Sequence, residues 1–261
     1  ADFRDPWTHI GYHKKLKLRS FAQNKHKKFE AAVLQNADEL LVTSQKTKTL
    51  FLELTTQPIT VLTNGFDFEI TDDSSLDSKF TLSHIGSLLE GRNPSILWKV
   101  LSDLVKESVE FASAFQLNLI GSLSPEVLES IQSYGLEDYI CTIGYIPHNA
   151  VLEYQRKTQL LLLIEEDSKE TEYIIPGKLF EYMASKRPII AIGPKTSDIE
   201  TILNQTRSGA YLRYDEAAAL RSLLLQHFEV FKAHQLKVDS KGLEAYSRKS
   251  LTQQLAQKLR N

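Results

Sequence analysis

Short apolar runs alternate with longer amphipathic stretches through most of this chain, and that alternation limits its fold more than any other feature. Runs such as 80–85 and 159–164 are apolar and too short to be helices. The stretches that follow, such as 94–106, repeat apolar residues at helical spacing. Strands that alternate with helices form βαβ units, whose strands lie parallel in one sheet. We therefore predict an α/β fold, with helices flanking a parallel sheet in which the continuously apolar run 159–164 is central.

A change of composition divides the chain into parts. The segment 66–78 is rich in Asp and Ser and is typical of a linker. Before it, strands at 39–43 and 58–62 are separated by a helix that Ser44 caps. The sequence therefore predicts three parts, which are a partial N-terminal domain (1–75), a complete α/β domain (76–240), and a C-terminal helix (241–261) that crosses back to the first part.

Three of the expected strands end at a glycine, namely Gly86, Gly121 and Gly144. Sheets of this kind bind ligands at the carboxyl ends of their strands, where glycine allows the backbone to approach a ligand. A tight turn is the alternative reason for a glycine at these positions. The shared placement of the three favours a ligand crevice at this edge.

Charge and cysteine content restrict the partners and the compartment. The formal net charge is −2 and the isoelectric point about 6.4, so nucleic acid is not an expected partner. The only cysteine, Cys141, excludes a disulfide framework and suits a reducing, cytoplasmic compartment. The one basic run, 13–28, is either a solvated surface or a peripheral contact with an anionic membrane. No His, Cys and Asp residues cluster at the spacing of metal ligands, so we expect neither a metal nor another cofactor.

The segment 173–191 carries the strongest chemical signal. Pro176 is expected at the first position of a helix, which leaves the amides of Gly177 and Lys178 free at its start. Free amides and a lysine suit an anion such as a diphosphate. Glu181, one turn later, suits a vicinal diol such as a ribose. The alternative is an ordinary helix start with a surface lysine and a glutamate favoured by the helix dipole.

The same segment resembles a family motif. Residues 180–191, Phe-Glu-Tyr-Met-Ala-Ser-Lys-Arg-Pro-Ile-Ile-Ala, resemble the end of the E-x7-E signature of family 4 retaining glycosyltransferases, which have the GT-B fold of two Rossmann-like halves. The resemblance implies that Glu181 holds the ribose hydroxyls of a nucleotide-sugar donor. Tyr173 stands where the family has the first Glu of the signature, which lies near the donor sugar.

Two further segments resemble elements of this donor-binding half. Residues 85–94 resemble a Gly-Arg-Leu-x-x-x-Lys-Gly element whose cations grip the diphosphate, with Ser87 on the Arg position and Arg92 on the Lys position. Residues 144–154 resemble a stretch whose backbone contacts the base, around Tyr145 and Ile146. The residues and the resemblance together give catalytic roles to Arg92, Lys178 and Glu181, with charge stabilisation by the two cations. They give donor binding to Gly86, Ser87, Tyr145, Ile146, Tyr173, Pro176, Gly177 and Leu179. His148 is expected to be a surface loop residue.

The first 70 residues resemble the end of the family's N-terminal, acceptor-side domain. Asp38 to Ser44 and Pro58 to Asp67 match its last strands, and Asp5 lies in a loop expected to face the cleft between the two halves. The resemblance implies that about 100 or more residues precede this chain in a complete enzyme, so we expect a fragment.

The resemblance implies a hexosyltransferase that moves a sugar from a nucleotide diphospho-sugar to an acceptor with retention. The motif Pro-Gly-Lys-Leu-Phe-Glu-Tyr resembles a subgroup that makes bacterial surface polysaccharides, so the acceptor is expected to be a polysaccharide or a lipid-linked sugar. One alternative is a non-catalytic module of the same fold that binds a nucleotide or a partner protein, which the Tyr173 departure favours. Another alternative is a sugar-nucleotide epimerase.

Overall fold

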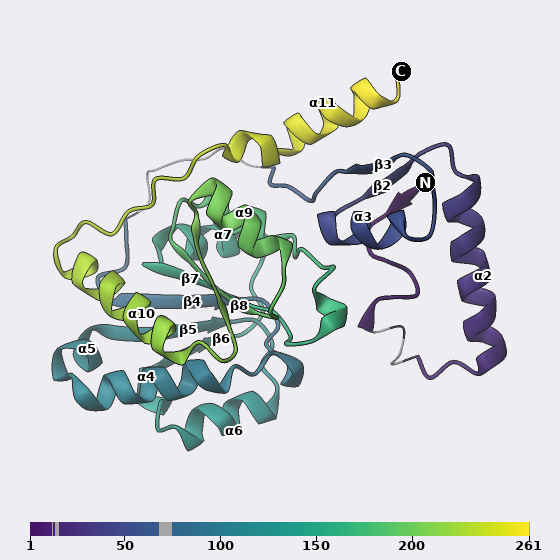
Figure 1. Cartoon of the computed structure of the whole chain (residues 1–261). Helices are drawn as coiled ribbons and strands as arrows, with labels where there is room; N and C mark the ends of the chain where they lie inside the picture. Colours follow the sequence, from purple (N-terminus) through teal and green to yellow (C-terminus); the bar gives the residue numbers. More distant parts are fainter. Residues whose placement is uncertain (12, 14–15, 68–74, 261) are drawn as a thin grey trace.

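The computed structural model of the chain describes residues 1–11, 13, 16–67 and 75–260. Figure 1 shows two α/β parts side by side, one built on six strands and one on three. Both sheets contain only parallel strand pairs among the described residues, as the alternation of strands and helices predicts.

The larger sheet has the strand order β6-β5-β4-β7-β8-β9. The strands β4 and β7 lie at its centre, as the continuous apolar run of β7 predicts, and every residue of both is buried. The bounds of the strands are β4 Phe80–Ile85, β5 Phe115–Ile120, β6 Ile140–Ile143, β7 Leu160–Ile164, β8 Ile189–Gly193 and β9 Gly209–Arg213.

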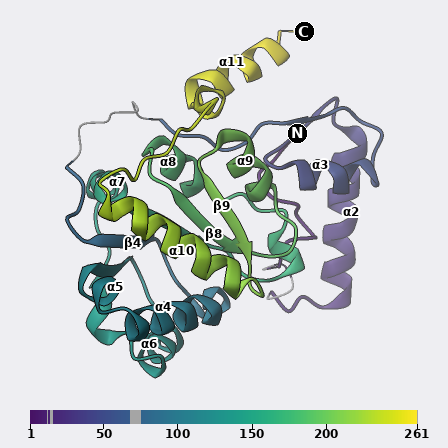
Figure 2. The same cartoon turned by 60° about the vertical axis from the view of Figure 1, so that its left-hand side comes forward.

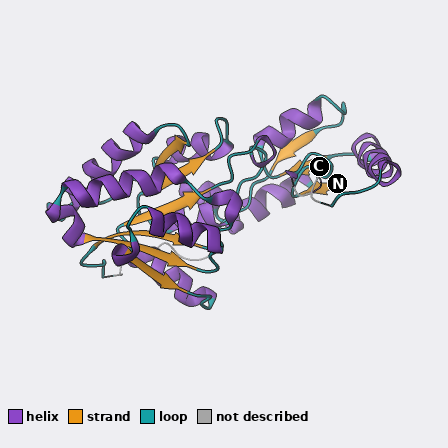
Figure 3. Cartoon of the chain, turned by 90° about the horizontal axis from the view of Figure 1, so that it is seen from below, coloured by secondary structure: helices purple, strands orange, loops and turns teal. Residues whose placement is uncertain are grey.

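Helices cover both faces of this sheet (Figure 3). Side chains alternate between faces along a strand, so Leu160 and Leu162 face one helix layer and Leu161 and Leu163 face the other. In Figure 2 the helix α10 crosses the first face. That face is covered by α4 Ser95–Glu107, α5 Val109–Ala114, α6 Pro125–Ser133 and α10 Ala217–Lys232, and the other by α7 His148–Lys157, α8 Lys178–Ala184 and α9 Asp198–Thr206.

The smaller part is a three-stranded parallel sheet in the order β1-β2-β3, made of β1 Asp2–Phe3, β2 Leu40–Val42 and β3 Ile59–Val61. The helices α2 Ser20–Asn36 and α3 Gln45–Leu52 accompany it. The side chain of Ser44 accepts a hydrogen bond from the Thr47 amide, which confirms the predicted cap of α3. The rings of Phe3 and Phe51 meet edge to face, 4.9 Å apart, in its small core.

The last part of the chain joins the two parts. The Phe66 amide donates to the Tyr246 carbonyl (3.1 Å), and the Arg248 amide donates to the Phe66 carbonyl (2.9 Å). Beyond this point α11 (Arg248–Lys258) lies above β2 and β3, and Lys258 pairs with Glu39 at 2.5 Å. The small part also contacts the large one through the Lys46 amide, which donates to Asp198 (3.0 Å).

Some predicted element bounds are wrong. The expected continuous tail helix from Leu243 is two elements, a 3-10 turn Leu243–Tyr246 and α11, because Ser247 adopts an extended backbone and caps α11 through the Ser250 amide. The helix α8 begins at Lys178, with Gly177 as its cap residue, so Pro176 is not the first helical position. The helix α5 was not predicted, since six residues carry too little periodicity. None of the helices in the described ranges is long and apolar enough to cross a membrane.

Candidate functional site

The strand order of the large sheet reverses between β4 and β7. The chain proceeds from β4 to β5 on one side, and from β7 to β8 on the other. The loops that leave the carboxyl ends of β4 and β7 therefore diverge, and we call the region between these loops the crevice. Parallel α/β sheets bind their ligands at such a switch point, so this edge is the candidate site.

Glycine has a steric role at two strand ends of this edge. Gly86 and Gly121 have φ angles of 125° and 120°, which side chains rarely allow. A Cβ atom on Gly121 would lie 2.8 Å from the Gly86 carbonyl oxygen, so the two loops touch through their backbones. A Cβ on Gly144 would meet nothing within 4 Å, so the third strand end lacks this constraint.

The amino group of Lys178 reaches the end of β4, where it lies 3.5 Å from the position of a Cβ on Gly86. Burial of this amino group lowers the pKa of Lys178 to about 8, although the negative charge of Glu165 raises it in part. The positive charge of Arg92 lowers the pKa further. The cation that the sequence predicts is therefore in the crevice, with Arg92 as its neighbour.

Glu165 directly follows β7 and forms the other wall of the crevice. Its side chain is 3% exposed, and one oxygen lies 3.8 Å from an Arg92 guanidinium nitrogen. Burial raises the pKa of this carboxyl, and the charges of Lys178 and Arg92 lower it in part. Within the described ranges neither carboxylate oxygen has a hydrogen-bond partner. Glu165 carries no sequence signal of its own, because a glutamate after a strand resembles any loop charge.

His84 lies under the crevice, on β4, and is completely buried. Its Nδ1 is 3.1 Å from the Leu162 carbonyl oxygen, so Nδ1 carries the proton and donates. Burial keeps the pKa of His84 well below its usual value, and the charge of Lys178 lowers it further. The ring is therefore neutral, and it adds no charge to the crevice floor.

Glu181 lies on α8 and is held by two side chains of α7. Its Oε1 is 3.2 Å from His148 Nε2, and its Oε2 accepts a hydrogen bond from Gln155 Nε2 at 3.2 Å. The expected place of His148 in a surface loop is wrong. His148 is the first residue of α7, and it is a partner of the predicted ribose-binding carboxylate. Neither contact has a sequence signal, because the partners lie 33 and 26 residues from Glu181.

A pocket of about 380 Å³ opens in front of Glu181, between the two parts of the molecule. The large part contributes Glu181 and Gly177, and the small part contributes Arg4 and Asn64. Arg4 is the residue before Asp5, so the loop predicted to face this cleft does reach it through its arginine. The other lining residues are Leu62, Thr63, Gly65, Arg248, Leu251, Thr252 and Leu255.

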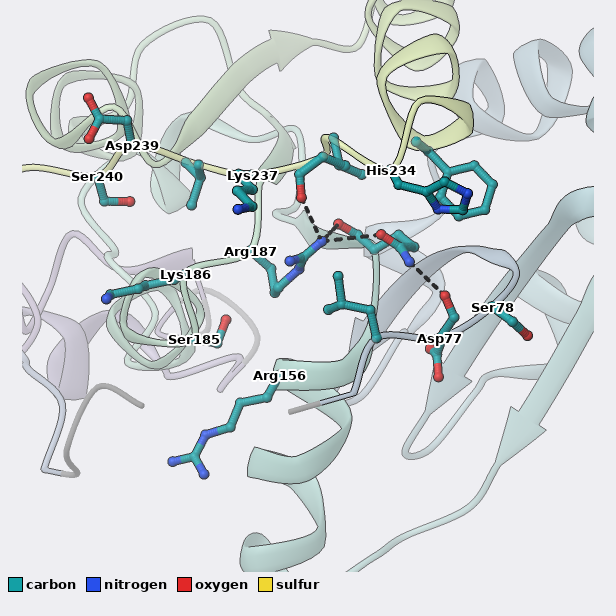
Figure 4. A pocket seen from close by; sticks show the side chains of 15 residues that line it. Asp77, Ser78, Arg156, Ser185, Lys186, Arg187, His234, Lys237, Asp239 and Ser240 are labelled. Atoms are coloured by element: carbon teal, nitrogen blue, oxygen red, sulfur yellow. Dashed lines mark hydrogen bonds between the residues drawn. The ribbon is translucent and has the colours of Figure 1, made fainter. Parts of the chain in front are cut away.

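A larger cavity of about 690 Å³ lies at the opposite, amino edge of the sheet (Figure 4). Arg187, which precedes β8, donates to the Gln159 carbonyl (3.1 Å) and to the Leu236 carbonyl (3.5 Å). In Figure 4 its guanidinium points at the segment that carries Lys237. Arg187 thus ties the segment after α10 to the start of β7, which is a structural role.

Solved glycosyltransferases share this architecture. Sucrose-phosphate synthase from Thermosynechococcus elongatus matches with a TM-score of 0.70 and 16% identity, over 99% of this chain and 66% of its own. HepE from Anabaena, in complex with UDP and glucose, matches with a TM-score of 0.69 and 16% identity, over 100% and 71%. TarM from S. aureus has a TM-score of 0.62 and 16% identity, over 89% and 46%. The fold is that of these glycosyltransferases.

The likeness confirms the predicted fold class, a GT-B-like pair of parallel α/β parts. This chain spans about two thirds of the length of the synthase and less than half that of TarM. No protein-family profile and no curated protein matches the sequence.

The remaining predicted site residues take varied places on this glycosyltransferase fold. Tyr145 is 92% exposed beyond β6, whereas Ile146 packs against the core. Leu179 is completely buried and its amide donates to the Pro176 carbonyl (3.0 Å), so it supports the start of α8. Ser87 is exposed after Gly86. Tyr173 and Asp5 are half-buried, and burial raises the pKa of both.

Proposed function

We propose that this chain binds the nucleotide diphospho-sugar donor of a glycosyltransferase at the carboxyl edge of the large sheet. The observation that supports this most is the pair of cations, Arg92 and Lys178, beside Gly86 at the switch point. A diphosphate carries the charge that two adjacent cations stabilise, and arginine can grip it with two hydrogen bonds. Gly86 leaves room for the phosphates near the backbone.

The nucleoside would extend from the diphosphate towards Glu181. The carboxylate of Glu181 is oriented by His148 and Gln155, and its remaining lone pairs can accept from both hydroxyls of a ribose. The base would lie against the backbone of Tyr145 and Ile146, which gives no side-chain code for its identity. Arg4 and Asn64 of the small part line the pocket in front of Glu181, so they would lie close to the bound nucleoside.

The proposed reaction is transfer of a hexose with retention. The bond from the anomeric carbon to the diphosphate oxygen breaks with its electron pair on the diphosphate, and a bond forms to an acceptor hydroxyl, whose proton passes to the leaving diphosphate. Arg92 and Lys178 would stabilise the charge that develops there, so we propose no metal. We propose a cytoplasmic enzyme of surface polysaccharide synthesis, whose acceptor is a saccharide or a lipid-linked sugar.

Calorimetric titration with UDP, GDP, ADP and the matching nucleosides tests the donor site. We expect one diphosphate to bind, and its uncharged nucleoside to bind much more weakly because it lacks the charge that the cations hold. Lys178→Met should remove most of the difference between them, whereas Lys99→Met, on the exposed side of α4, should leave it unchanged. Equal binding of nucleoside and diphosphate to the wild type would contradict the site.

Tyr173 favours a second function, that of a non-catalytic binding module. It takes the place of the carboxylate that lies near the donor sugar in the resembling family. This alternative predicts that the chain binds a nucleotide-sugar without consuming it, even with an acceptor present. Proton NMR can follow slow hydrolysis of the donor by the chain. Hydrolysis would support the enzyme, and its absence would support the binding module. The anomer of the sugar that is released first tests retention.

We further propose peripheral contact between α2 and an anionic membrane. Phe21 is 81% exposed and Phe29 47% exposed, and Lys25 lies 5.4 Å from the centre of the Phe29 ring. An aromatic and basic helix face suits the boundary of an anionic bilayer. Phe21→Ser should reduce sedimentation with phosphatidylserine vesicles, unlike Leu128→Ser on α6. Equal sedimentation of both variants and the wild type would contradict the contact.

A further inference from the structure

The crevice that suits an anion also contains a buried carboxylate, Glu165. A negative charge beside a diphosphate site opposes binding unless it has another task. Nor does Glu165 stabilise the fold through hydrogen bonds of its side chain, since within the described ranges neither oxygen has a partner. Its charge acts through space on two cations, Arg92 at 3.8 Å and Lys178.

The backbone of Glu165 is fixed on both sides. Its amide donates to the Ile192 carbonyl (2.9 Å), and its carbonyl accepts from the Tyr214 hydroxyl (2.7 Å). The carboxylate thus leaves a rigid strand end, 3.8 Å from Arg92 and close enough to Lys178 to act on its charge. A loop charge in solvent would have no such anchorage.

Two cations held together in a half-buried crevice repel each other, and the low local dielectric strengthens this repulsion. The repulsion and burial both favour loss of the proton from Lys178, which would leave the crevice with one cation. A carboxylate near both of them offsets the repulsion and keeps both in the crevice before the ligand arrives.

We propose that Glu165 is a positioning residue, which holds Lys178 charged and Arg92 in place for the diphosphate of the donor. This inference rests on the proposed function, because it names what prepares the same site. Glu165 would act through the two cations and would not contact the nucleotide itself. The other ionisable groups that face this cluster are neutral His84 on β4, Glu166 after Glu165, Tyr182 on α8, Tyr211 on β9 and Tyr214 after β9.

The test is the affinity for UDP, or for whichever diphosphate binds, between pH 6.5 and 9.5 in Glu165→Gln. Loss of the carboxylate lowers the pKa of Lys178, so its charge disappears at a lower pH. We expect binding about tenfold weaker than in the wild type at pH 8, and a smaller difference at pH 6.5, where Lys178 is charged in both proteins. A role in folding alone would weaken binding equally at every pH, which would overturn the proposal.

Two controls make the comparison specific. Glu165→Asp keeps the charge and should restore much of the wild-type pH profile, while Glu129→Gln, an exposed carboxylate on α6, should not shift it. Lys178→Met should cost less affinity in the Glu165→Gln background than in the wild type, because the two residues act on one interaction. Additive losses would contradict coupling between Glu165 and Lys178.

The proposed function and this inference fail separately. If the wild type binds no nucleoside diphosphate, the donor site is wrong. The titration of isotopically methylated Lys178, followed by NMR, then still reports whether Glu165→Gln lowers the pKa of that lysine. An unchanged titration sinks the positioning role even if nucleotides bind.

Discussion

Replacing Gly65 with alanine should detach the C-terminal helix from the small part of the molecule. A Cβ at this position would lie 2.6 Å from Leu251 Cδ1 and would also collide with the Tyr246 carbonyl oxygen. A backbone carbonyl cannot rotate away as a flexible side chain can, so the segment 246–251 must move. The movement would strain both hydrogen bonds that Phe66 makes with Tyr246 and Arg248.

Typical interaction energies give the size of the effect. Each of the two strained hydrogen bonds contributes about 0.5–1.5 kcal/mol, and overpacking costs about 1–3 kcal/mol. We therefore expect Gly65→Ala to lower the free energy of unfolding by about 2–6 kcal/mol, measured by urea denaturation. Limited proteolysis should cut α11 faster than in the wild type.

Gly144→Ala is the matched control, because a Cβ there meets nothing within 4 Å and the backbone needs no positive φ. It should change the stability by less than about 0.5 kcal/mol. If Gly65→Ala behaves like this control, the close contact between residue 65 and the C-terminal segment does not exist, and the arrangement of the two parts is wrong.

Three further predictions concern the site and its support. Diphosphate binding should weaken as the pH rises through about 8, because Lys178 is cationic only below its pKa. The variant Lys178→Arg should bind without that decline. Isothermal titration calorimetry across this pH range checks both. Glu181→Ala should weaken UDP binding but leave inorganic pyrophosphate binding unchanged, and equal losses for the two ligands would refute its ribose role. Tyr182→Phe should cost about 1–3 kcal/mol of stability in urea denaturation, because it leaves the buried Ile85 amide without the Tyr182 hydroxyl (3.0 Å), and a neutral result would contradict that bond.

Features of the fold that repeat along the chain could be predicted from the sequence. The apolar run of β7 indicates a strand buried on both faces, and the structure places it at the centre. Gly86 and Gly121 mark the carboxyl edge of the large sheet, where their positive φ and the close approach of their loops require glycine. Ser44 predicts a helix start because its hydroxyl can accept from an amide three residues later.

Contacts between distant elements could not be predicted in this way. His148 and Gln155 meet Glu181 only because α7 and α8 cover the same face of the sheet. Glu165 joins Arg92 across the switch point, so its importance depends on the strand order and not on its neighbours in sequence. The predicted tail helix breaks at Ser247, where pairing with Phe66 selects an extended backbone over a helical one.

The pairing of Phe66 with Tyr246 also sets an order of folding. These residues are 180 positions apart (246 − 66), and the whole six-stranded sheet is synthesised between them. The large part can form its sheet from neighbouring βαβ units as it leaves the ribosome, since chains generally fold unit by unit from the N-terminus. The three-stranded part is made before the six-stranded part, but α11, which lies above β2 and β3, is made after it. Until then its β2 and β3 stay exposed to other chains, so slow synthesis of residues 243–258 should make the nascent protein more prone to aggregate.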